Sequence, residues 1–230
     1  MTFLTIGHRG VMGVEPENTL RSFVRAERSG MDVVALDLRL SKDGALVVLH
    51  DAEVDRTTDG SGAVADLTLA ELRGLDAGDG QQVPLLEEVL DAVRAPLRVQ
   101  VHDLSAVGAF SELLLRRDLT GRVEVASFSD EVLAEAARLV PGVRTVLYAN
   151  QGTADAEAAV ARAVAAGAET IALNIQHLTL HTVEAAHAAG LLVTGWTVNS
   201  LERLRLARAL ELDGVLTDFP EIRSTGRFTA

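Results

Sequence analysis

Apolar segments of the kind that form β-strands alternate along this chain with amphipathic segments of the kind that form helices. The strand-like segments span residues 4–8, 33–40, 97–102, 123–127, 145–148, 170–174, 191–198 and 214–217. The helix-like segments begin near Thr19, Leu85, Ala106, Asp130, Ala154, Thr179 and Ser200. Such alternation predicts parallel strands joined by crossover helices. About eight strands in a chain of this length favour an α/β fold of the TIM (β/α)8 barrel type, with an open doubly wound sheet as the competing fold.

Residues at the ends of the helix-like segments support this division. Ser129 and Ser200 are good N-cap residues, because a serine side chain can accept a hydrogen bond from a free N–H of the first helical turn. Gly30, Gly167 and Gly190 follow helix-like segments at the places where helices should end. The same residues therefore indicate where the chain turns toward the next strand.

One segment breaks the alternation. Residues 36–40 and 46–49 are both strand-like, and Asp43-Gly44 lies between them, which predicts a β-hairpin. Residues 51–83 follow as a long irregular insertion, and loops of this length are uncommon unless they are functional. Its donor-rich part around Arg56 could approach a ligand, and an insertion that simply covers the barrel rim is the equal alternative.

Composition limits the function classes. The chain has 230 residues, 48% of them hydrophobic, and no Pro-rich or Ser-rich linker, so we expect residues 1–230 to form one domain that includes the insertion 51–83. No integral membrane segment and no signal peptide are evident, which favours a cytoplasmic protein. The absence of cysteine excludes disulfides and a cysteine nucleophile. A net charge of −12 argues against a nucleic-acid partner, but it leaves a small anion in a local pocket open, and the oligomeric state is not predicted.

Candidate reactive side chains lie at the ends of the first strands. His8 and Arg9 end the first strand, Asp37 lies on the second, and His50 follows the hairpin. In a barrel these positions meet at one mouth. Two histidines can divide acid and base catalysis near neutral pH, and Arg9 can offer paired donors to a phosphate. Taken singly, each histidine is more often a structural residue and Arg9 an ion-pair partner.

Several short motifs follow one another in a fixed order. They are His8-Arg9-Gly10, Pro16-Glu17-Asn18-Thr19, Asp37 with Ser41-Lys42-Asp43-Gly44, His50-Asp51, Arg56-Thr57-Thr58, and the later segments 83–88, 195–199 and 213–220. Together they resemble the glycerophosphodiester phosphodiesterase family over nearly the whole chain. The resemblance implies a TIM barrel of the phospholipase-C-like phosphodiesterase type. It also implies a small-molecule phosphodiester substrate, His8 and His50 as the catalytic pair, and glycerol 3-phosphate and an alcohol as the products.

Two positions depart from the metal site of that family. The family carries Glu-X-Asp on strand two and Glu-X-Lys on strand three, where this chain has Ala35-Leu36-Asp37 and Gln100-Val101-His102. A methyl group cannot ligate a cation, and a glutamine oxygen brings no charge. A divalent metal, magnesium or calcium, held by Asp37 and Gln100 with Asp103 or Glu17 as helpers, is therefore left open.

His102 offers a second route to charge stabilisation. A protonated imidazole at the lysine-like position would face the phosphate and partly replace the metal. A structural pairing of His102 with the adjacent Gln100 or with another polar group of the rim is the equal alternative.

Three further residues are assigned to the substrate pocket. They are Glu17, Asn174 at the end of a strand, and Trp196, the single tryptophan. Glu17-Asn18-Thr19 could equally open the first helix, and core packing could explain Trp196.

The function hypothesis is a hydrolase of glycerophosphodiesters with weakened or altered metal dependence. The alternative is a catalytically impaired relative that binds phosphodiesters without turnover.

Overall fold

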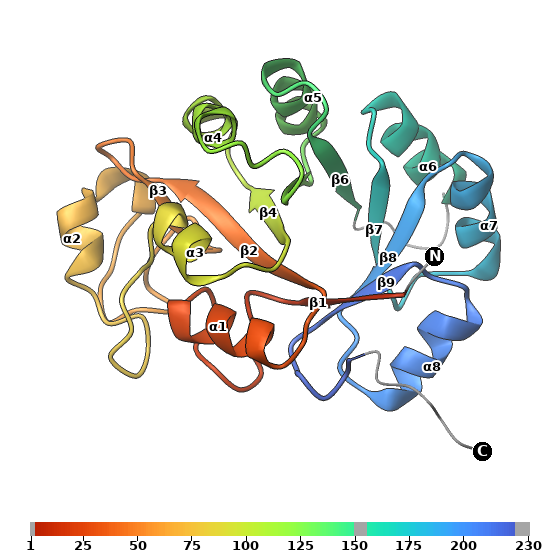
Figure 1. Ribbon diagram of the computed structural model, residues 1–230, viewed down its shortest axis with the longest axis horizontal. Helices are drawn as coiled ribbons and strands as arrows, with labels where there is room; N and C mark the ends of the chain where they lie inside the picture. Colours follow the sequence, from red (N-terminus) through yellow and green to blue (C-terminus); the bar gives the residue numbers. More distant parts are fainter. Residues whose placement is uncertain (1–2, 150–155, 224–230) are drawn as a thin grey trace.

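The computed structural model describes residues 3–149 and 156–223 and shows a closed barrel with helices around its outside (Figure 1). The sheet order is β1-β9-β8-β7-β6-β5-β4-β2-β3, and a further pairing of β1 with β2 closes the ring. The eight strands of the ring run parallel, while β3 pairs antiparallel with β2 and lies outside it. The predicted TIM barrel is confirmed, and the open doubly wound sheet is excluded because β1 contacts both β2 and β9.

The elements follow the predicted alternation closely. The strands are β1 (Leu4–Gly7), β2 (Val33–Leu40), β3 (Leu46–Val48), β4 (Leu97–Val101), β5 (Val123–Ser127), β6 (Arg144–Ala149), β7 (Thr170–Asn174), β8 (Leu192–Trp196) and β9 (Gly214–Thr217). The helices are α1 (Leu20–Arg28), α2 (Leu69–Arg73), α3 (Leu86–Ala92), α4 (Leu104–Arg116), α5 (Asp130–Leu139), α6 (Ala156–Ala165), α7 (Leu180–Ala188) and α8 (Leu201–Ala209), with a short 3-10 turn η1 (Val64–Asp66). The predicted helix start near Ala154 lies outside the described residues.

The predicted helix ends are confirmed at both termini. The Ser129 and Ser200 side chains accept hydrogen bonds from backbone N–H groups of the first turns of α5 and α8. Gly30, Gly167 and Gly190 all have positive φ, the conformation that a glycine adopts without steric cost after a helix. The predicted start of α4 was two residues late, because Leu104 begins the helix but is 49% exposed and so falls outside the apolar pattern.

Strand β2 pairs with β3 of the hairpin on one edge and with β4 on the other. Leu38 pairs with Val48 across the antiparallel ladder, and Gly44 in the turn has a φ of 83°. The other edge of β2 pairs with β4, with Asp37 opposite Gln100. Side chains of two strands that are far apart in the sequence therefore share one part of the barrel mouth.

Residues 51–83 pack as a small layer against the hairpin. Their apolar side chains join those of β3 in a separate cluster that contains Val47, Leu49, Val54, Val64, Leu72, Ala77 and Val83. Figure 1 shows this layer, with α2, projecting from one side of the barrel. One of its residues, Arg56, reaches back to Glu17 in the loop after β1. The insertion therefore packs on the hairpin and contacts the loop that carries candidate site residues.

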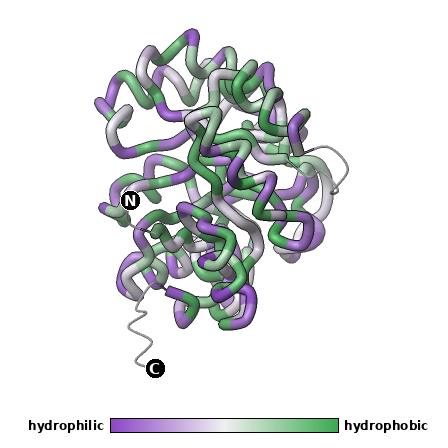
Figure 2. The backbone as a smooth tube through the Cα atoms, turned by 90° about the vertical axis from the view of Figure 1, so that its right-hand side faces the viewer, coloured by the Kyte–Doolittle hydropathy of each residue, from purple (hydrophilic) through white to green (hydrophobic). Residues whose placement is uncertain are grey.

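Two apolar layers hold the barrel together. The larger fills the space between strands and helices, and Figure 2 shows hydrophobic and hydrophilic stretches alternating along the outer helices. The smaller lies inside the ring and contains Ile6, Val33, Ala35, Ala126, Val146, Tyr148, Ala172 and Leu216, with Trp196 against it. In the described part of the chain, each helix is too short or too polar to cross a membrane.

Candidate active site

The turn after β1 presents His8 and Arg9 to the barrel mouth. Arg9 has a φ of 50°, which is uncommon for a non-glycine residue and typical of functional turns. Gly10 follows with a φ of 84°, and a Cβ at this position would lie 2.2 Å from Ser22 Oγ. The turn can therefore lie this close to α1 only with glycine at position 10. Ser22 Oγ in turn accepts the N–H of Val11 and donates to the carbonyl oxygen of Arg9.

His8 is paired with a carboxylate from the opposite end of the sequence. Its Nδ1 lies 2.7 Å from Oδ1 of Asp218, which follows β9. Asn199 donates to the other carboxylate oxygen of Asp218 at 2.5 Å. Burial alone would raise the pKa of Asp218, but the hydrogen bond and charge of His8, the hydrogen bond from Asn199 and the charge of Arg9 together lower the pKa below its usual value. Asp218 therefore stays ionised and holds the His8 ring in one orientation.

His50 has a similar arrangement with its neighbour. Its Nδ1 lies 2.5 Å from Oδ1 of Asp51, and Arg56 donates to Oδ2 of the same carboxylate at 2.6 Å. The Arg56 hydrogen bond lowers the pKa of Asp51 well below its usual range. Burial lowers the pKa of His50, although Asp37 and Asp51 oppose the shift. His50 is therefore mainly neutral at neutral pH and can accept a proton.

Asp37 is buried and surrounded by donors. Asn18, whose φ is 56°, donates from its side chain to Oδ2 at 2.9 Å and accepts the Asp37 N–H at 3.3 Å. Arg9 Nε lies 3.3 Å from Oδ2, and His102 Nε2 lies 2.9 Å from Oδ1. Burial alone would raise the pKa of Asp37, but the His102 hydrogen bond and the Arg9 charge hold it well below the usual range. Asp37 is therefore a fixed negative charge at the floor of the site.

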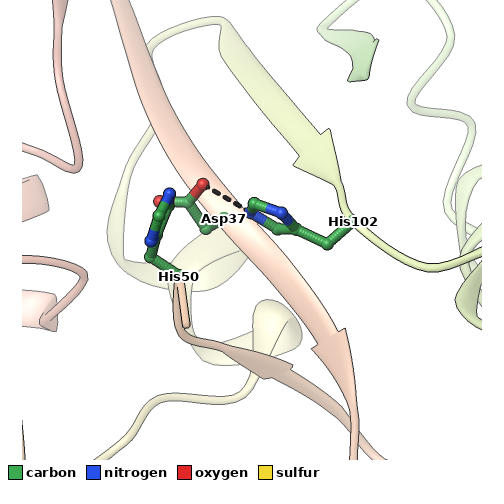
Figure 3. Close-up of side chains that lie close together, drawn as sticks. All are labelled: Asp37, His50 and His102. Carbon is green, nitrogen blue, oxygen red and sulfur yellow. Dashed lines mark hydrogen bonds and ion pairs between the residues drawn. The ribbon is translucent and has the colours of Figure 1, made fainter. Parts of the chain in front are cut away.

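Asp37, His50 and His102 form one compact group. Figure 3 shows the Asp37 carboxylate between the two imidazole rings, with a dashed line to His102. One ligand atom from each residue lies within 4.8 Å of the other two. The ring centroids of His50 and His102 are 5.1 Å apart in an edge-to-face arrangement. The Gln100 side-chain nitrogen lies 3.3 Å from His102 Nε2, but this ring nitrogen can either accept from Gln100 or donate to Asp37 and cannot do both.

A cavity of about 330 Å³ opens beside this group. Its lining consists of His8, Arg9, His50, Gln100, Phe128, Tyr148, Trp196, Thr197 and Leu216. The predicted convergence of His8, Arg9 and His50 on one space is therefore observed, and Trp196 and Gln100 line the same space. His8, Arg9 and His50 supply basic side chains to this lining, and Phe128, Tyr148 and Trp196 supply aromatic ones. The ring centroids of Phe128, Tyr148 and Trp196 lie 5.2 to 6.2 Å from one another.

Tyr148 can be observed separately because it is the single tyrosine of the chain. Burial raises its pKa to about 12. We expect the absorbance of phenolate at about 295 nm to rise with a midpoint near that value in the folded protein, and near the ordinary value of about 10 in urea. A midpoint near 10 without denaturant would contradict the buried position of the hydroxyl at the cavity wall.

Three predicted residues have different roles from those expected. Asn174 does not line the cavity, because its side-chain oxygen accepts the backbone N–H of Gln176 in the turn after β7. Glu17 lies in a neighbouring recess, with both carboxylate oxygens bound to Arg56 and one also to Arg9. Asp103, the other suggested helper for a metal, pairs with Arg39 at 2.7 Å. Neither carboxylate is free to assist Asp37.

Other residues of the site were not assigned from the sequence. Asp218 directly follows the last strand, and closure of the barrel brings that strand beside the first. Its position in the sequence could therefore have predicted a place near His8. Phe128 directly follows β5, so its position could likewise have predicted a place at the barrel mouth. Tyr148 lies within β6, where its aromatic side chain is equally typical of core packing.

The side chains that could ligate a metal together with Asp37 do not fit magnesium or calcium. These ions bind oxygen ligands and need negative charge to offset their dehydration. Ala35 occupies the position facing Arg98 on the neighbouring strand and provides a methyl group only. Within the described residues, the group that could hold a metal offers two imidazole rings and a single carboxylate. That set is rich in nitrogen and poor in charge.

Comparisons with known proteins identify the family of the chain. A family model described as the glycerophosphoryl diester phosphodiesterase family matches residues 8–222. A glycerophosphodiester phosphodiesterase of Bacillus subtilis is 33% identical over 252 residues, which covers 95% of this chain and 84% of the relative. One from Caldanaerobacter subterraneus is 32% identical and covers 96% of both chains.

Solved structures give the same result. A phosphodiesterase of Oleispira antarctica in complex with the product sn-glycerol-3-phosphate has a TM-score of 0.87 and 27% identity, covering 95% of this chain and 94% of that one. A glycerophosphodiester phosphodiesterase of Thermotoga maritima has a TM-score of 0.84 and 28% identity, covering 96% and 97%. With the family model spanning nearly all of the barrel, the chain belongs to the glycerophosphoryl diester phosphodiesterase family.

Proposed function

We propose that this protein hydrolyses glycerophosphodiesters to glycerol 3-phosphate and an alcohol in the cavity at the barrel mouth. The observation that carries the proposal is that His8, Arg9 and His50 line one cavity although they come from separate segments. The curated relatives named glycerophosphodiester phosphodiesterase support the same reaction. The Oleispira phosphodiesterase holds sn-glycerol-3-phosphate, and a cavity of this size suits a ligand of that kind.

The two histidines would share proton transfer. One imidazole accepts the proton of the oxygen that attacks phosphorus, and the other donates a proton to the departing alkoxide. Asp218 and Asp51 each hold the Nδ1 of one ring, at 2.7 and 2.5 Å. Because a carboxylate at Nδ1 fixes the tautomer, each ring keeps Nε2 as its reactive nitrogen. The two aspartates therefore act as positioning residues.

Arg9 and His102 would stabilise the negative charge on phosphate. Arg9 lines the cavity, and its planar guanidinium offers paired donors that match two phosphate oxygens. His102 does not line the cavity itself, and it would act through Asp37, which binds His102 Nε2 and lies 3.3 Å from Arg9 Nε. Fixed donors at the place where charge develops are the strongest general source of rate enhancement. These groups take over part of the charge stabilisation that a metal supplies elsewhere.

Divalent metals are typical cofactors in this family, and this chain would depend on them weakly. The Asp37, His50 and His102 group could hold a divalent cation. Asp37 and Gln100 together supply one carboxylate, whereas magnesium and calcium favour a second one. The acid, base and phosphate-binding roles above are accordingly assigned to side chains alone.

The aromatic wall would contact the carbon atoms of the substrate. Trp196 Nε1 is buried and has no hydrogen-bond partner among the described residues. An unpaired buried donor is costly unless a ligand completes it. We assign it to a substrate oxygen, with Phe128 and Tyr148 packing against the glycerol or alcohol carbons.

Release of glycerol 3-phosphate from a panel of glycerophosphodiesters tests the proposal. The purified protein should release it both with magnesium or calcium and after treatment with a chelator, because no catalytic step above passes through a metal. Failure to release it under either condition would contradict the proposal and favour a binding protein. The cytoplasm as compartment and the absence of a nucleic-acid partner stay predictions from the composition.

A further inference from the structure

We propose that Asp37, His50 and His102 form a binding site for a borderline first-row transition-metal ion such as Zn²⁺, and that its occupancy inhibits hydrolysis. The inhibition rests on the proposed function, whereas the binding does not. The starting observation is the disagreement between the oxygen-binding cations expected for the family and the two imidazoles present here.

The three donors are already close together. One ligand atom of each residue lies within 4.8 Å of the others, and His102 Nε2 is 2.9 Å from Asp37 Oδ1. Imidazole nitrogen and carboxylate oxygen bind Zn²⁺ at about 2.0–2.2 Å. Small side-chain rotations would therefore bring all three donors to one ion, without movement of the strands.

Outer hydrogen bonds leave the correct atoms available. Asp51 occupies His50 Nδ1, so His50 Nε2 is the nitrogen left for an ion. Asn18 occupies Asp37 Oδ2, so Oδ1 is the oxygen left on the side of His102. A carboxylate behind a ligating histidine is the usual arrangement at protein metal sites, because it fixes the tautomer and increases ligand basicity.

The donor set selects the kind of ion. Two nitrogens and one carboxylate oxygen suit zinc, cobalt, nickel or iron, which bind neutral imidazole well. Magnesium and calcium prefer several charged oxygens, whereas this group supplies a single carboxylate. Three protein ligands would leave an open coordination position.

Occupancy has a direct consequence for the proposed reaction. His50 Nε2 cannot bind an ion and transfer a proton at the same time, so a bound ion removes one half of the acid and base pair. It also replaces the hydrogen bond between His102 and Asp37. We therefore expect added Zn²⁺ to lower the rate, and a chelator to restore it.

Metal titration of the full chain tests the site without using activity. Co²⁺ should give visible absorption bands typical of nitrogen ligation, and calorimetry with Zn²⁺ should show one site. His102→Ala and Asp37→Asn should each weaken Zn²⁺ binding by at least about tenfold. Asp51→Asn, which keeps all three ligands, should weaken it about 10- to 100-fold. His181→Ala is the control, because this histidine is 71% exposed on α7 and should leave binding unchanged.

Circular dichroism confirms that each variant is folded before its affinity is compared. Equal Zn²⁺ affinity in the wild type, His102→Ala and Asp37→Asn would overturn the site. A rate that rises with Zn²⁺ would overturn the inhibition. Absence of hydrolysis in metal-free protein would count against the proposed function, while the Co²⁺ spectrum would still report the site.

Discussion

Replacing either His8 or His50 with glutamine is expected to lower kcat/KM for glycerol 3-phosphate release by about 10²- to 10⁴-fold, the usual contribution of a general acid or base. Glutamine has a similar size and can still hydrogen-bond, but it cannot take up or release a proton near neutral pH. The effect should therefore come from lost proton transfer, because both side chains line the cavity without belonging to the buried core. Initial rates over a range of substrate concentrations measure it.

The double variant distinguishes a cooperating pair from two independent residues. Groups that act in one step are strongly non-additive, so the double variant should be little slower than the slower single variant. His181→Gln serves as the control, because its side chain is 71% exposed and does not line the cavity. A single variant at His8 or His50 with unchanged kcat/KM would remove that residue from the reaction.

Local sequence patterns were sufficient for most of the fold. The structure confirms the eight apolar strand segments, the serine N-caps and the glycines that end helices. Each of these features depends mainly on residues that are neighbours in the sequence. The start of α4 was placed late because Leu104 is exposed, and an apolar residue on the surface breaks the amphipathic pattern. Helix starts depend on where the backbone turns, which periodicity locates only to within a few residues.

The site was predictable where it depends on strand ends and unpredictable where it depends on tertiary pairing. His8 follows barrel strand β1, and His50 follows β3, which the hairpin holds against barrel strand β2, so their convergence comes from the topology of the fold. The pairing of His8 with Asp218 spans 210 positions and exists because β9 closes against β1. Asn174 looked equally well placed at the end of β7, but its side chain bonds the local backbone instead.

A buried ion pair lies inside the barrel below the site. Arg98 on β4 is 1% exposed, and its Nε donates to Glu124 on β5 at 3.0 Å. Its Nη1 donates to Thr194 on β8 at 3.1 Å. Glu124 also pairs with Arg144 at 2.9 Å. The group therefore links four barrel strands, β4, β5, β6 and β8, and its Arg98 and Glu124 charges have little contact with water.

Glu124→Gln is expected to lower the free energy of unfolding by about 3–5 kcal/mol, the usual cost of removing one partner from a buried ion pair. The amide is close in shape to the carboxylate, so packing is preserved. Arg98 then remains charged in the barrel interior without a counter-charge. Urea unfolding followed by far-ultraviolet circular dichroism measures the loss.

Replacing both partners separates the cost of an unpaired charge from the value of the pair. Arg98→Met combined with Glu124→Leu should be neutral, or stabilising by up to about 4 kcal/mol, because the apolar pair needs no desolvation of charges. Arg144 is 41% exposed and can return to water when it loses Glu124. If the double variant lost as much stability as Glu124→Gln, the ion pair itself would be the stabilising element, and the bond from Arg98 to Thr194 would be the next contact to test.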